Sequence, residues 1–117
     1  MFDILLVVLA CESAVCDEPS KHWDNACVAV TALRDPEEDP GTDDVTFYLA
    51  QGDWSQIRVG TWDEPAGLWF PGLDGVGVRV VSEASGLSCV GVTEIDLEPF
   101  EYREVGVQTR CQVEGYE

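Results

Sequence analysis

The chain has 117 residues, a length that fits one domain with a single core. Its 6 basic and 23 acidic residues give a net charge of −17, and repulsion from phosphate groups argues against nucleic acids and anionic membrane surfaces as partners. Hydrophobic residues make up 45% of the sequence, which is too many for a disordered chain. We therefore expect an acidic, folded domain.

The first apolar segment, residues 4–9, is followed by Ala10 and Cys11. The sequence Val8-Leu9-Ala10-Cys11 resembles the end of a bacterial lipoprotein signal peptide, in which an apolar run and a small residue precede the cysteine that becomes lipidated. The resemblance implies removal of residues 1–10, a lipid on Cys11, and anchoring to the membrane of the bacterial cell envelope. Two alternatives stay open. One is export to the extracellular space without a lipid, and the other is a first β-strand, since the run is too short to span a bilayer.

Five cysteines are present, and their number agrees with lipidation of one of them: Cys11, Cys16, Cys27, Cys89 and Cys111. If Cys11 carries a lipid, the other four form two disulfides. We expect Cys16 to pair with Cys27, because the polar segment between them has little else to hold it. We expect Cys89 to pair with Cys111 across the last two strands. The alternative is Cys27 with Cys89, the inter-sheet bridge of immunoglobulin domains.

We expect residues 11–25 to form a polar tether or a disulfide-closed lobe. The residues that follow, 26–117, show the pattern of β-strands. Apolar residues alternate with polar ones over 26–33, 45–50, 55–62, 76–81, 87–94 and 102–113. Residues 45–50 and 55–62, with a turn at Gly52-Asp53 between them, predict a β-hairpin. In its second strand we expect Ile57 and Val59 to point inward, with Gln56 and Arg58 outward. These roughly six strands, with turn residues between them, predict an all-β antiparallel sandwich stabilised by disulfides, with an immunoglobulin-like topology as one form.

Residues 63–75 are rich in proline and glycine and predict a loop with a bulky apolar tip, Leu68-Trp69-Phe70. Together with Trp62, these three side chains are the candidate contact surface for a protein or glycan partner. An exposed planar aromatic can stack on a sugar ring or anchor a protein. The alternative is that the tryptophans close the open ends of the sandwich as part of its core.

No residue pattern predicts catalysis. The single histidine, His22, lies in the expected disulfide lobe, and no serine occupies a nucleophile elbow. Asp63 and Glu64 are the best pair for glycosidase-like acid and base chemistry, but so small a sandwich leaves little room for a substrate cleft. We therefore predict no enzyme activity, no catalytic residue and no cofactor.

The acidic loop over residues 34–44 is the best candidate for calcium, which prefers hard oxygen ligands. Its carboxylates are Asp35, Glu37, Glu38, Asp39, Asp43 and Asp44. Their spacing lacks the register of a known calcium loop, so we predict a solvated loop and no metal site. The sequence favours an exported, lipid-anchored, non-enzymatic envelope or surface protein that contacts the membrane through its lipid. The alternative is a carbohydrate- or calcium-dependent binding module that uses the tryptophan-bearing loops.

Overall fold

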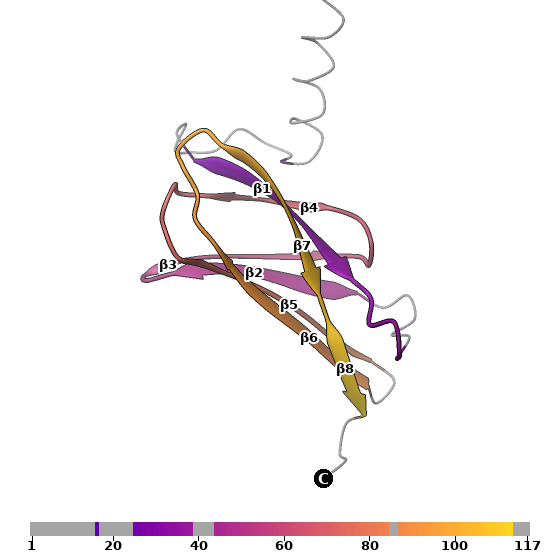
Figure 1. The fold of residues 1–117 in the computed structure, drawn as a ribbon. Coiled ribbons are helices and arrows are strands. Elements are labelled where there is room, and N and C mark those ends of the chain that lie inside the picture. Colours follow the sequence, from indigo (N-terminus) through magenta and orange to yellow (C-terminus); the bar gives the residue numbers. More distant parts are fainter. Residues whose placement is uncertain (1–15, 17–24, 39–43, 85–86, 114–117) are drawn as a thin grey trace, which may run out of the picture.

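The computed structural model describes residues 16, 25–38, 44–84 and 87–113, and these form two packed sheets without any helix (Figure 1). One sheet has three strands in the order β4-β1-β7, and the other has five in the order β3-β2-β5-β6-β8. The predicted all-β sandwich is therefore confirmed. The strands are β1 Ala26–Leu33, β2 Val45–Gln51, β3 Trp54–Gly60, β4 Ala66–Phe70, β5 Val76–Ala84, β6 Leu87–Ile95, β7 Tyr102–Gln108 and β8 Arg110–Val113.

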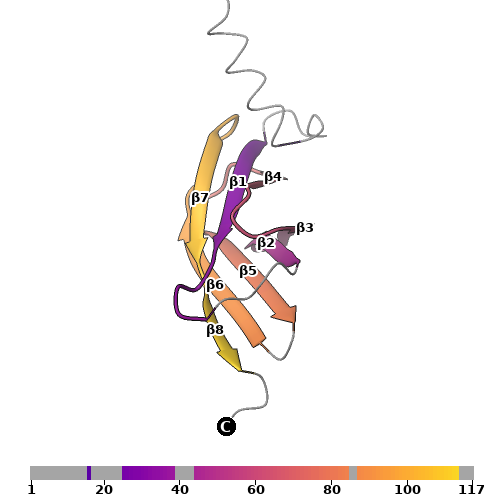
Figure 2. The ribbon, with the colours of Figure 1, turned by 90° about the vertical axis from the view of Figure 1, so that its right-hand side faces the viewer.

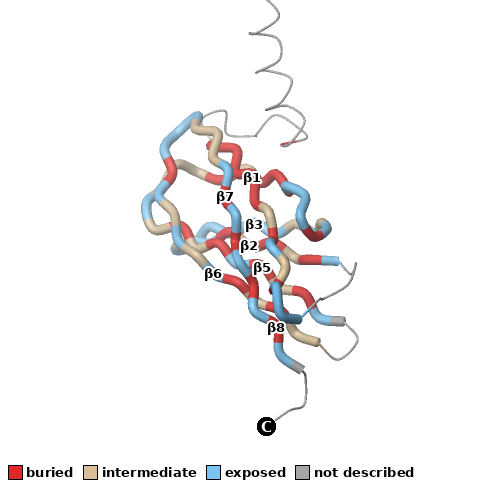
Figure 3. Tube along the Cα trace, turned by 45° about the vertical axis from the view of Figure 1, so that its right-hand side comes forward, coloured by how far each residue is buried: buried red, intermediate tan, exposed pale blue. Residues whose placement is uncertain are grey.

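The core lies between the inner faces of the two sheets. Val45, Phe47 and Leu49 of β2 alternate with less buried residues, and each is almost fully buried. Val28 and Val30 supply the same kind of surface from β1. Since successive side chains of a strand point to opposite faces, this alternation buries one face of each sheet. Figure 3 shows the same alternation of buried and exposed positions along β7 and β8.

One strand pair departs from the expected antiparallel pattern. β1 and β7 are parallel, with Val30 opposite Val105, and they lie side by side in Figure 2. A parallel pair needs a long crossover connection. Here the chain between the two strands supplies β4 to the same sheet and β2, β3, β5 and β6 to the other, so the first strand pairs with the last but one.

The predicted last strand over residues 102–113 is divided at Thr109 into β7 and β8, which belong to different sheets. The backbone N–H and the hydroxyl of Thr109 both donate to the carbonyl oxygen of Leu33, at 3.1 and 2.7 Å. The chain crosses from one sheet to the other over Gly91, where a Cβ atom would lie 2.6 Å from the carbonyl oxygen of Gln108. Glycine permits this close approach of two backbones. Val105, Val107 and Cys111 are buried, whereas the side chain of Val113 lies outside the described residues.

The hairpin of β2 and β3 forms as predicted, but the orientation predicted for β3 is wrong. Ile57 and Val59 are 63% and 59% exposed, and Arg58 lies opposite Phe47 on the inner face. The reason is the two-residue turn at Gly52-Asp53, which places Gln51 opposite Trp54 and so fixes the register of the whole hairpin.

Candidate functional site

The two disulfides join the pairs favoured by the sequence, Cys16 with Cys27 and Cys89 with Cys111. The second bridge links residues that lie directly opposite each other on β6 and β8, with their Cα atoms 4.0 Å apart. The alternative bridge of immunoglobulin type, Cys27 with Cys89, is therefore absent. Two disulfides fit an oxidising compartment outside the reducing cytosol. Cys11 lies outside the described residues.

The candidate contact surface of Trp62, Leu68, Trp69 and Phe70 is not an exposed loop, so this prediction is wrong in its premise. Three of these side chains are buried, with exposed fractions of 5% for Trp62, 4% for Leu68 and 0% for Phe70. The reason is that residues 66–70 form β4 and pair with β1, which turns Leu68 and Phe70 toward the core. Trp69 lies opposite Cys27 on the other face of this sheet and is half-buried.

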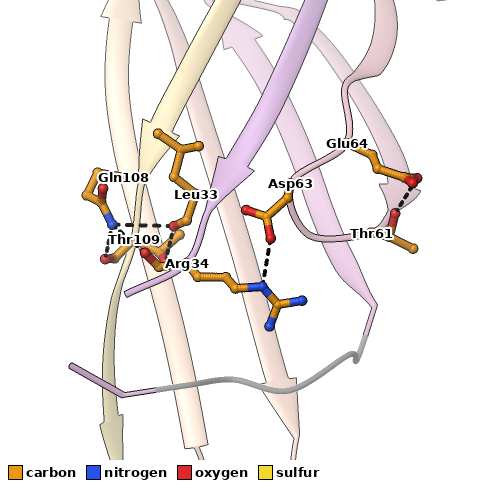
Figure 4. A network of polar contacts seen from close by, with 7 residues as sticks. All are labelled: Leu33, Arg34, Thr61, Asp63, Glu64, Gln108 and Thr109. Atoms are coloured by element: carbon orange, nitrogen blue, oxygen red, sulfur yellow. Dashed lines mark hydrogen bonds and ion pairs between the residues drawn. The ribbon is translucent and has the colours of Figure 1, made fainter. Parts of the chain in front are cut away.

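A network of polar contacts ties the end of β1 to the turn between β3 and β4 (Figure 4). Arg34 and Asp63 form an ion pair at 2.7 Å, and the backbone N–H of Asp63 donates to the carbonyl oxygen of Ala32 at 3.0 Å. Glu64 accepts a hydrogen bond from the hydroxyl of Thr61 at 3.0 Å. The guanidinium of Arg34 also lies 5.7 Å from the ring centre of Trp62. Both carboxylates of the glycosidase-like pair thus bond to neighbouring side chains and hold the turn.

On the other side of this network the side-chain amide of Gln108 donates to the carbonyl oxygen of Arg34 at 2.8 Å. Together with the bonds from Thr109 to Leu33, this contact fixes the point at which the chain passes from β7 to β8 (Figure 4). The carbonyl groups of Leu33 and Arg34, at the end of β1, therefore accept hydrogen bonds from Thr109 and Gln108. These bonds explain why the end of β1 and the sheet crossing occur at the same place.

Asp35 was a candidate calcium ligand, and the structure gives its carboxylate another role. One oxygen accepts the backbone N–H of Glu37 and the other that of Cys111, each at 2.8 Å. These backbone hydrogen bonds, first from Glu37 and then from Cys111, lower the pKa of Asp35. The carboxylate therefore fastens the acidic loop to β8. The sequence signal for it is an Asx turn, in which an aspartate side chain accepts the N–H two residues later.

The remaining candidate calcium ligands do not gather around Asp35. Glu37, Glu38 and Asp44 are exposed, while Asp39 and Asp43 lie outside the described residues. Within residues 16, 25–38, 44–84 and 87–113, no group of three or more histidine, cysteine, aspartate or glutamate side chains is arranged to hold a metal ion.

A shallow hollow of about 260 Å³ lies beside the three-stranded sheet, lined by Ala29, Thr31, Pro65, Glu104, Val105 and Gly106. Small residues on β1 and β7 leave this space. Glu104 is the ionisable residue of the lining, and it accepts a hydrogen bond from the hydroxyl of Tyr102 at 3.3 Å. Sequence reasoning missed the hollow because its small side chains come from three distant segments and form no motif. Its chemistry suits a hydrogen bond to a hydroxyl or amino group.

Comparisons with known protein families, with curated proteins and with solved structures find no match for this chain. In the part of the chain that the structure describes, no helix is long and apolar enough to cross a membrane. The functional assignment therefore rests on the residues themselves.

Proposed function

We propose that this chain is an exported, lipid-anchored protein of the bacterial cell envelope with a non-enzymatic role. The observation that supports the proposal is the use of its cysteines. The two bridges take up four of the five, and the cysteine left over is Cys11, which follows the apolar run and Ala10. Disulfides persist in oxidising compartments, so the bridges and the signal-like segment favour the same destination.

A lipid on Cys11 would hold the sandwich close to the membrane. Cys16 is bonded to Cys27, the second residue of β1, so the tether is the short stretch between Cys11 and Cys16. Five residue steps span at most about 18 Å. The net charge of −17 would repel an anionic membrane surface, so attachment would depend on the lipid and not on the protein surface.

A non-enzymatic role is supported by what the reactive side chains do. Cys16, Cys27, Cys89 and Cys111 are in disulfides, and the pair of Asp63 and Glu64 binds to neighbouring side chains. A binding module that uses the tryptophan-bearing loops loses its support, because Trp62, Leu68 and Phe70 are buried.

Expression of the full chain in a bacterium with a clickable fatty-acid analogue tests the proposal. We expect label on the wild-type protein, its recovery with membranes, and an intact mass that lacks residues 1–10. Cys11→Ser should abolish the label and release the protein from membranes, whereas Ser13→Ala, two residues away, should keep both properties. An unlabelled cytoplasmic protein that retains Met1 would refute the proposal. A cleaved but unlabelled protein in the medium would support export without lipidation.

A further inference from the structure

Strand β3 forms one edge of the five-stranded sheet, and most of its residues are exposed. Among the described residues, the strand order places β3 at the end of its sheet with β2 as its one partner. Its first four residues are all exposed, and so is Val59. Natural proteins protect such edges with prolines, charged residues, bulges or short strands. β3 has seven residues, no proline and a regular pairing with β2 over its whole length.

Arg58, the charged residue of β3, does not protect the edge from pairing with another strand. Arg58 shares the inner face with Phe47 of β2, and its guanidinium donates to the carbonyl oxygen of Gly67 in β4 at 2.7 Å. The side chains that project from the opposite face of β3 include Ile57 and Val59, which are mostly exposed. The open edge is therefore apolar as well as regular.

The hairpin turn determines which backbone groups of β3 face outward. Residues that flank a two-residue turn form a hydrogen-bonded pair, and such pairs alternate with non-bonded ones along an antiparallel ladder. Since Gln51 and Trp54 flank the turn, the N–H and C=O groups of Ser55, Ile57 and Val59 point away from β2. These groups present the donors and acceptors that another antiparallel strand requires.

The lack of acidic residues along β3 allows that strand to come from a second copy of this chain. Two chains of net charge −17 repel each other, and this repulsion opposes contact least at surfaces with few acidic residues. Residues 54–62 contain no acidic residue, and residues 45–62 contain one, Asp53. By contrast, the edge strand β7 carries Glu104 and directly follows Glu101. The edge strands β4 and β8 also lack acidic residues but are shorter, so β3 is the longest edge strand without one among the described residues.

We propose that β3 pairs antiparallel with β3 of a second copy, around a two-fold axis at Ile57. Full overlap of Trp54–Gly60 places Ile57 opposite its own symmetry mate and Ser55 opposite Val59 of the second copy. The outward backbone groups then form roughly six hydrogen bonds, and the two five-stranded sheets become one continuous sheet. The same patch serves both copies, as two-fold symmetry requires. The Ile57 side chains meet on the outer face, where they lose contact with water.

The test compares two lysine substitutions on the same sheet face in the full chain. Ile57→Lys places a charge at the axis. Val92→Lys is the matched control, because Val92 is 68% exposed but belongs to β6, away from the edge. In analytical ultracentrifugation over a concentration series, wild type and Val92→Lys should sediment as dimers, and Ile57→Lys as a monomer with at least a tenfold weaker association. Equal melting temperatures of the two variants show that the fold is kept.

Cross-linking in intact cells provides a second readout that needs neither detergent nor purification. A hydrogen-bonded antiparallel pair has its Cα atoms about 5.5 Å apart, within disulfide range. Ile57→Cys should give a reducible covalent dimer, and Val92→Cys should not. A wild-type protein that is monomeric at every concentration, a dimeric Ile57→Lys variant, or equal cross-linking at both positions would overturn the proposal. If this edge instead binds a strand of another protein, the wild-type chain should be monomeric at every concentration, which is the first of these results.

Discussion

Replacement of Trp62 tests whether this side chain is part of the core. Its exposed fraction is 5%, and the guanidinium of Arg34 lies 5.7 Å from its ring centre. The indole nitrogen Nε1 is buried and has no hydrogen-bond partner among the described residues. The ring therefore stabilises the fold by burial while its N–H group opposes that stabilisation, and two substitutions can separate the two effects.

The expected free energies follow from these contacts. Truncation of a buried aromatic residue to alanine costs about 3–5 kcal/mol, and loss of the cation–π contact with Arg34 adds about 0.5–1 kcal/mol. Removal of an unpaired buried donor returns about 1–3 kcal/mol. Trp62→Ala should thus lower the free energy of unfolding by about 3 kcal/mol. In Trp62→Phe the smaller ring buries on the order of 50 Å² less, which costs about 1 kcal/mol. Since that loss is offset by removal of the N–H group, Trp62→Phe should stay within about 1 kcal/mol of wild type.

Urea unfolding followed by far-ultraviolet circular dichroism, with both disulfides intact, measures these differences. Trp54→Ala is the control for an exposed tryptophan, since Trp54 is 49% exposed, and it should cost less than about 1 kcal/mol. A cost below about 1 kcal/mol for Trp62→Ala would show that the indole does not fill the core. A cost of more than about 1 kcal/mol for Trp62→Phe would show that Nε1 has a partner.

Two further substitutions test the contacts that join the acidic loop and the sheet crossing to the rest of the fold. Backbone hydrogen bonds lower the pKa of Asp35 below the ordinary value of about 3.9, so its carboxylate stabilises the fold above about pH 4, and this contribution is lost as the pH falls through the lowered pKa. Asp35→Asn should therefore be less stable at pH 7 and lose less stability on acidification than wild type or the exposed control Asp53→Asn; identical melting curves between pH 7 and pH 2 would contradict this. Gly91→Ala should cost about 1–3 kcal/mol, because its Cβ atom would lie 2.6 Å from the carbonyl oxygen of Gln108. Gly77→Ala, whose nearest contact is 3.6 Å, should cost less than about 1 kcal/mol, and equal urea midpoints for the two variants would refute the close approach.

Alternation and turn chemistry were sufficient to predict the class of fold. The strand over residues 26–33 has the predicted bounds, and the turn at Gly52-Asp53 lies where the hairpin required it. The disulfides were predictable for a similar reason. Cys89 and Cys111 lie on the sheet neighbours β6 and β8, which the sequence showed as its last two strands, and Cys16 is separated from Cys27 by a short polar segment. These features depend on residues close together in the chain, so local sequence carries them.

The roles of Trp62 and Asp35 were decided by the tertiary structure alone, and that of Ile57 by the register of the β2–β3 hairpin. The alternation of β3 is the same whichever face is buried, and only pairing with β2 from the turn onward places Ile57 outside. The segment with Leu68-Trp69-Phe70 has the prolines and glycines of a loop, yet pairing with β1 makes it a strand and buries two of its three apolar residues. Asp35 finds the N–H of Cys111 far along the chain, because β8 crosses to the other sheet beside it. Partners brought together by the packing of two sheets leave no trace in local periodicity, which is why they could not be predicted from the sequence.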